Sequence, residues 1–271
     1  MSSPWPLRAL QYLLLFLMAA LCLYPFWWTL CQALAQDSAP LWPPPLVPAN
    51  PGLGNFVEVA NNLPIARHLG NSILITAATV GLRLLFCTLA AWALARWRFR
   101  GKRLALGILF ATLLLPSEVN FLVNFITISK LGWHDSLAGV LAPNLVHVVS
   151  IFMLQQAFAA LPADLMDAAR LDGAGEFQVF FHIALPLLAP WLATVAILGA
   201  VEAWNDYLWP SIVLSRPEDL PLSAAVLYLK GVFGSNAQVI AAGAIITVLP
   251  VTLLFLACQR FFLRGLDGAL K

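Results

Sequence analysis

Ionisable side chains inside apolar stretches are the residues of this sequence best suited to chemistry. Arg83, Glu118 and Glu202 each stand within a run of apolar residues that could cross a membrane. Charges at membrane depth are costly, so they indicate an ion pair, a solute route or a coupling-ion site. Arg83 and Glu118 lie about 13 and 15 residues, or roughly 20 and 22 Å, from the same side of the membrane, and Glu202 lies at a comparable level. We expect Arg83 to pair with Glu118, with Glu202 as the second choice.

Amide groups and a carboxylate form a second set of polar residues. Asn120 and Asn124 lie one helical turn apart and would suit the lining of a wet interior. Asn205 and Asp206 stand between tryptophans near the end of an apolar run, where they could cap the helix at the membrane surface or contact a solute pathway. His147, alone in an apolar run, is interpreted as structural. The four cysteines are isolated and no GxxxxGK[ST] loop occurs, so no metal, cofactor or nucleotide site is expected.

The composition places these residues in a membrane protein. Of 271 residues, 61% are hydrophobic and 10% charged, whereas soluble domains carry about 25% charged residues. A helix of about 20 mostly apolar residues crosses the hydrocarbon. We therefore predict an all-α membrane protein with a single domain over 1–271 and six transmembrane helices, at about 9–34, 69–95, 104–128, 136–159, 186–213 and 239–263. The first span is too long for the apolar core of a signal peptide, which favours an uncleaved helix.

The distribution of positive charge predicts the orientation. Ten of the fifteen Lys and Arg residues fall on the side of the two termini, five of them within 96–103, and four fall on the opposite side. By the positive-inside rule, both termini and the loop 161–185 are expected in the cytoplasm. The Pro-rich segment 35–67 is expected to be a stiff, extended connector, and 215–236 a polar one.

The loop 161–185 is the longest polar interruption in the second half of the chain. Pro162 and Asp164 suit the start of a helix and Gly173 suits its end, so a short helix is predicted over 163–172. Its apolar face is expected to consist of Leu161, Leu165, Ala168 and Ala169. A second short amphipathic piece is predicted over 176–183. Such a helix could lie on lipid or dock on a protein; a single cation, Arg170, is little for binding anionic headgroups, which favours docking.

Several motifs of this chain resemble those of ABC importer permeases of the maltose/glycerol-3-phosphate type, and they occur in the same order along the chain. The loop sequence DAARLDGAGEFQVFFHIALP is similar to the EAA loop of that family, with Asp167 in place of the usual Glu. Further similarities are Tyr24-Pro25-Phe26-Trp27-Trp28, Gly70-Asn71-Ser72, Ala91-Trp92-Ala93-Leu94-Ala95-Arg96, Trp204-Asn205-Asp206 and the C-terminal Gly268-Ala269-Leu270-Lys271.

The resemblance implies a type I ABC importer permease fold, in which the loop helix is a coupling helix between spans four and five. Asp167, Ala168, Ala169 and Gly173 would contact an ATP-binding subunit, with Asp172 supporting the turn. The chain would do no chemistry itself, because a separate subunit hydrolyses ATP.

The other implied partners are a second, different permease and an extracytoplasmic solute-binding protein, in a bacterial or archaeal inner membrane. The solute would be a sugar or related polyol, with glycerol-3-phosphate as the alternative. An ion-coupled secondary transporter is a rival interpretation, although no internal repeat supports it; a membrane enzyme is a second, although only Glu202 and Asp206 approach a carboxylate cluster.

Overall fold

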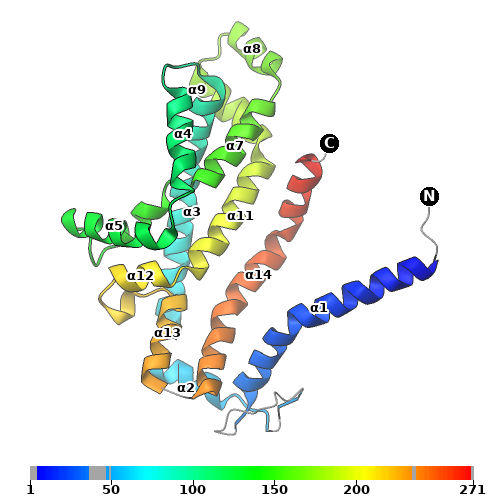
Figure 1. Cartoon of the computed structure of the whole chain (residues 1–271), viewed down its shortest axis with the longest axis vertical. Helices are drawn as coiled ribbons and strands as arrows, with labels where there is room; N and C mark the ends of the chain where they lie inside the picture. Colours follow the sequence, from blue (N-terminus) through cyan, green and yellow to red (C-terminus); the bar gives the residue numbers. More distant parts are fainter. Residues whose placement is uncertain (1–4, 37–46, 49, 234–235, 270–271) are drawn as a thin grey trace. The chain divides into compact units, whose positions relative to one another are not determined.

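The structure, a computed structural model, describes residues 5–36, 47–48, 50–233 and 236–269, and this part is helical without a β-strand (Figure 1). The predicted all-α class is therefore confirmed. In chain order the helices are α1 (Trp5–Leu34), α2 (Gly54–Asn62), α3 (Ile65–Arg96), α4 (Lys102–Thr112), α5 (Ser117–Lys130), α6 (Leu137–Leu141), η1 (Ala142–Asn144), α7 (Val148–Ala160), α8 (Ala163–Leu171), α9 (Glu176–Gln178), η2 (Val179–Ala184), α10 (Leu185–Leu187), α11 (Ala189–Asn205), α12 (Leu208–Val213), η3 (Pro217–Asp219), α13 (Leu222–Phe233) and α14 (Ala237–Ala269).

Within the described residues, three helices are continuous and apolar over a length sufficient to cross a membrane. They are Arg8–Leu34 of α1, Ile65–Arg96 of α3 and Ala237–Leu254 of α14, and they correspond to the first, second and sixth predicted spans. Two more spans result if each of two bent helix pairs crosses once. The count of six stays a prediction.

The fourth and fifth predicted spans are these bent pairs. Leu137–Asn144 meets Val148–Ala160 at 51°, and Glu176–Leu187 meets Ala189–Asn205 at 74°. Prolines accompany both bends, with Pro143 in η1 and Pro190 at the start of α11. Proline lacks the backbone N–H that a helix interior requires, so a helix that contains one loses a hydrogen bond there. The bends therefore have a local cause in the sequence.

Other expected elements differ from the structure. A single helix over 104–128 was expected, but α4 ends at Thr112 and α5 begins at Ser117, after Pro116. The connector 35–67 was expected to be extended and 215–236 to be polar, but the first contains α2 and the second the apolar α13. The part of the first connector at 37–46 and residue 49 lie outside the described residues.

The chain forms two compact units, Met1–Ile65 with Ala225–Pro250, and Ala66–Ala224 with Val251–Lys271. In the first unit, the Asn55 side chain on α2 donates hydrogen bonds to the carbonyls of Ala33 (3.0 Å) and Ala35 (2.7 Å), and so caps the end of α1. The single domain expected over 1–271 stays a prediction.

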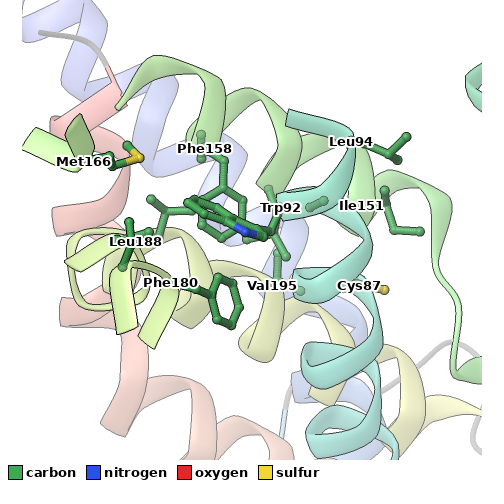
Figure 2. Close-up of a cluster of buried hydrophobic side chains, with 14 residues drawn as sticks. Cys87, Trp92, Leu94, Ile151, Phe158, Met166, Phe180, Leu188 and Val195 are labelled. Atoms are coloured by element: carbon green, nitrogen blue, oxygen red, sulfur yellow. The ribbon is translucent and has the colours of Figure 1, made fainter. Parts of the chain in front are cut away.

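The second unit has an aromatic core that joins α3, α7, α8, η2 and α11. Trp92 packs against Phe158 and Phe180, with ring centroids 5.2 and 5.4 Å apart. Figure 2 shows Met166 of α8 and Leu188 at the edge of this cluster. The short α8, at one end of the unit in Figure 1, is thus attached to the same core as the long helices.

Candidate functional site

The predicted helix of the loop 161–185 exists as α8, Ala163–Leu171, one residue shorter than expected. Pro162 precedes it with extended backbone geometry, Asp164 lies in its first turn and Arg170 in its last turn. These charges complement the helix dipole. The second predicted piece, 176–183, is also helical, as α9 followed by the π-helical turn η2.

Gly173 ends α8 in a left-handed conformation, with φ +87°. Its N–H donates to the carbonyl of Arg170 (3.1 Å), and the N–H of Ala174 donates to the carbonyl of Ala169 (2.9 Å). This pair of hydrogen bonds is the Schellman motif, which satisfies the last carbonyls of a helix. A left-handed residue with a side chain is strained at such a position, so the turn itself requires glycine.

Arg170 closes the loop after α8. Its guanidinium donates to Asp167 Oδ1 (2.7 Å) on the same helix and to Glu176 Oε1 (2.8 Å) at the start of α9. These hydrogen bonds, first to Glu176 and then to Asp167, raise the pKa of Arg170 above its usual value. Asp167, predicted to contact an ATP-binding subunit, therefore also has an ion-pair partner within its own helix.

Met166 fixes α8 to the rest of the second unit. Its side chain is 1% exposed, in the cluster of Trp92 and Phe158. Of the four residues predicted to form the apolar face, Leu161 and Ala169 pack against this cluster, but Leu165 and Ala168 are exposed. The four residues are thus divided between the core and the surface, and Met166, which was not among them, is the most buried residue of α8.

The outer side of this loop carries large apolar side chains. Leu171 is 89% exposed and Phe177 is 77% exposed, and Leu165 and Phe181 are also exposed. Asp172 and Gly173 lie among them, exposed as well. A rigidly ended helix with an uncovered apolar outer side is suited to contact another protein.

Arg96 joins the end of α3 to the approach to α8. Its Nη2 donates to the carbonyls of Phe158 (2.7 Å) and Leu161 (3.0 Å), at the end of α7, where carbonyls lack a full set of partners within the helix. Its guanidinium also lies 5.9 Å from the ring of Trp92. Arg96 was expected as a positive charge of the loop 96–103 and as part of the motif 91–96, and its hydrogen bonds to the end of α7 were not predicted.

A second polar site joins α3 and α11. Arg83 Nη1 donates to Glu202 Oε2 at 2.5 Å, and Arg83 Nε donates to the carbonyl of Asn144 at 3.2 Å. His147 Nε2 lies 3.9 Å from the same carboxylate oxygen. The structure thus places Arg83 against Glu202, the second choice of partner, whereas the side chain of Glu118 lies outside the described part.

The four predicted pathway residues separate in the structure. Asn120, Asn124 and Asp206 line one cavity, together with Asn144, which the sequence did not single out. Asn205 is exposed and donates to the carbonyl of Val201 (2.8 Å) within its own helix. Pro143 is the sequence signal that could have identified Asn144 as a lining residue, because a proline marks a helix break and polar groups at such a break can line a wet cavity.

Comparison with known proteins gives the family. Residues 85–268 match the family described as binding-protein-dependent transport system inner membrane component. The arabinooligosaccharides transport system permease protein AraQ of Halalkalibacterium halodurans is 34% identical over 226 residues, 83% of this chain and 81% of that protein. The sn-glycerol-3-phosphate transport system permease protein UgpE of Pectobacterium atrosepticum is 34% identical over 84% of each chain.

A solved structure agrees in fold. A chain of a bacterial ABC transporter involved in the import of the acidic polysaccharide alginate superposes with a TM-score of 0.81, at 24% identity, over 97% of this chain and 99% of that one. The expected ABC importer permease fold is confirmed, and the chain belongs to the family of inner membrane components of binding-protein-dependent transport systems.

Proposed function

We propose that this chain is one of two different permease subunits of an ATP-driven importer, and that the α8 loop receives the movement of an ATP-binding subunit. The observation that carries the proposal is the pairing of two properties in α8. Met166 is buried in the core shared with α3, α7 and α11, while Leu171 and Phe177 project outward uncovered. A displacement of the outer side is thereby transmitted to the long helices.

The orientation in the membrane follows from the charges. The excess of Lys and Arg on the side of the termini puts the α8 loop in the cytoplasm, where ATP is available. The opposite side then faces the solute-binding protein that the family name implies. A chain of a bacterial alginate ABC transporter, solved in complex with an alginate pentasaccharide-bound periplasmic protein, superposes with a TM-score of 0.69 at 17% identity.

The solute proposed is a sugar or related polyol. Relatives that share a third of their residues with this chain serve transport of arabinooligosaccharides and of sn-glycerol-3-phosphate. The neutral class is favoured over glycerol-3-phosphate because the guanidinium of Arg83, at 5% side-chain exposure, is occupied by Glu202 and the Asn144 carbonyl. A phosphate would find no free cation there.

The test is reconstitution of this chain with a second permease, an ATP-binding subunit and a solute-binding protein from the same organism. We expect the ATP-binding subunit to copurify with the chain, and this association to weaken at least about tenfold when Leu171→Asp and Phe177→Asp remove the apolar contact. Leu53→Asp and Val57→Asp, at exposed apolar residues of the connector 35–67 outside every predicted span, are the matched control. Undiminished copurification of the loop variant, or uptake driven by an ion gradient without an ATP-binding subunit, would overturn the proposal.

A further inference from the structure

A cavity of about 180 Å³ lies in the second unit, away from the α8 loop. It is lined by Asn120, Phe121, Asn124, Pro143, Asn144, Asp206 and Trp209. A water molecule takes about 30 Å³ in the liquid, so this volume corresponds to roughly six waters. It is large enough for a small group with several hydroxyls.

Two helix breaks place the polar groups around the cavity. Asn144 lies at the 51° bend between η1 and α7, and Asp206 lies in the break between α11 and α12. Asn120 and Asn124 face them from α5. Irregular backbone at membrane depth is tolerated where it lines a wet cavity or is buried in protein, so the breaks and the amide groups point to the same wet interior.

The wall of the cavity formed by Asp206 and Trp209 is held in position by hydrogen bonds and ring packing. The Trp209 N–H donates to Asp206 Oδ1 (3.2 Å), and Trp209 Nε1 donates to the carbonyl of Gly139 (3.2 Å). Phe121 packs against the Trp209 ring at 6.0 Å. A preorganised wall lowers the conformational entropy that binding would cost.

The lining suits a neutral, hydroxyl-rich group. Each asparagine offers both a donor and an acceptor, Asp206 offers acceptors, and two rings form the apolar side. The described lining holds no Lys or Arg, and Asp206 would repel a phosphate or carboxylate. Hydroxyls, which donate and accept, match this set of groups.

We infer that this cavity is a solute subsite of the permease, which binds one ring of a neutral sugar or polyol through Asn120, Asn124, Asn144 and Asp206. The inference rests on the proposed function, since it presupposes that the solute passes this subunit. It goes further because it assigns solute contacts to this chain. The proposed function alone would allow the paired permease to supply all of them.

The experiment measures saturation-transfer NMR from the complete purified transporter, without its binding protein, to arabinotriose, maltotriose and sn-glycerol-3-phosphate as separate probes. We expect transfer to a neutral trisaccharide and a loss of affinity of at least about tenfold in the Asn120→Leu/Asn124→Leu variant, because two hydrogen bonds are removed. Asn62→Leu, at an exposed asparagine of α2 that donates to the Glu58 carbonyl of its own helix and lies outside the lining, should bind like the wild type.

Each outcome decides the inference. Binding of neither trisaccharide, equal binding by the double variant, or tight binding of sn-glycerol-3-phosphate lost in the double variant would overturn it. Loss of the second permease from the double variant would also overturn it, since the cavity would then be a subunit contact. Copurification of the ATP-binding subunit and basal ATP hydrolysis report separately on the proposed function, so a failure there is distinguishable from a failure of the subsite.

Discussion

Arg83 and Glu202 form an ion pair in which only the cation is buried. The Arg83 side chain is 5% exposed and the Glu202 side chain 49%. Removing one partner of a buried pair is costly when the remaining charge cannot reach water. The two halves of this pair should therefore respond differently to substitution.

Glu202→Gln should destabilise the protein more than Arg83→Met. The first change leaves a buried guanidinium unpaired, which costs about 3–5 kcal/mol in a fully buried pair and roughly 1–3 kcal/mol here because half of the Glu202 side chain is not covered by this chain. The second removes the buried charge, and its effect should be about 1 kcal/mol. Thermal unfolding of the purified complex measures both. Arg67→Gln, which breaks an exposed pair with Asp219, is the control; a larger effect for Arg83→Met would contradict the burial argument.

Gly173→Ala should uncouple ATP hydrolysis from uptake. The Schellman turn needs φ +87° at this residue, and an L side chain in that conformation costs roughly 1–2 kcal/mol, which loosens the end of α8. Gly101→Ala is a matched control, because Gly101 has φ +93° and equally open surroundings but precedes α4. The ratio of solute imported to ATP hydrolysed should fall only for Gly173→Ala, and an equal fall for both would indicate a general loss of stability.

Met166→Ala should free α8 from the core without changing its outer side. Truncation of a buried Met costs about 2–5 kcal/mol. We expect faster amide hydrogen exchange over 163–174 in the variant, measured by mass spectrometry. Leu171→Ala, at a side chain that is almost fully exposed, should leave exchange unchanged in the isolated permease. Unchanged exchange in Met166→Ala would show that other contacts hold the helix.

Arg170→Gln should loosen the connection between α8 and α9, through loss of the hydrogen bonds to Asp167 and Glu176. The pKa of Arg170 is raised by these partners. Since the folded pKa exceeds the unfolded one, its contribution is fully present below the unfolded pKa and is lost only as pH rises through the folded value. Exchange protection over 167–176, corrected for intrinsic rates, should therefore not change through ionisation of Arg170 between pH 6 and 9. Arg170→Lys should keep part of the protection. The ammonium group bridges the two carboxylates less well than the planar guanidinium does.

The sequence predicted α8 closely because its signals are local. Pro162 and Gly173 set the helix ends by their own backbone preferences, whatever surrounds them. Local signals do not determine which side of α8 packs against the core. Which side is buried depends on where the core of Trp92 and Phe158 lies, so Met166 could not be chosen over Leu165 from spacing alone.

The sequence limits the partner of Arg83 to Glu118 or Glu202 but does not decide between these two carboxylates. The position along a span gives the depth in the membrane, and Glu118 and Glu202 are expected at similar depths. The rotation of each helix about its axis, which comes from packing, decides which carboxylate faces the guanidinium. The span expected over 104–128 failed for another reason, since average hydropathy is insensitive to the break at Pro116.

The Arg83–Glu202 pair joins residues 119 positions apart, and this separation has a consequence for biosynthesis. At about 5–20 residues per second, the ribosome needs on the order of 10 s to extend the chain from the arginine to its carboxylate. During that interval the second apolar helix has left the ribosome with its charge uncompensated by Glu202. The insertion machinery, rather than the finished bundle, must therefore shelter this guanidinium until α11 is made.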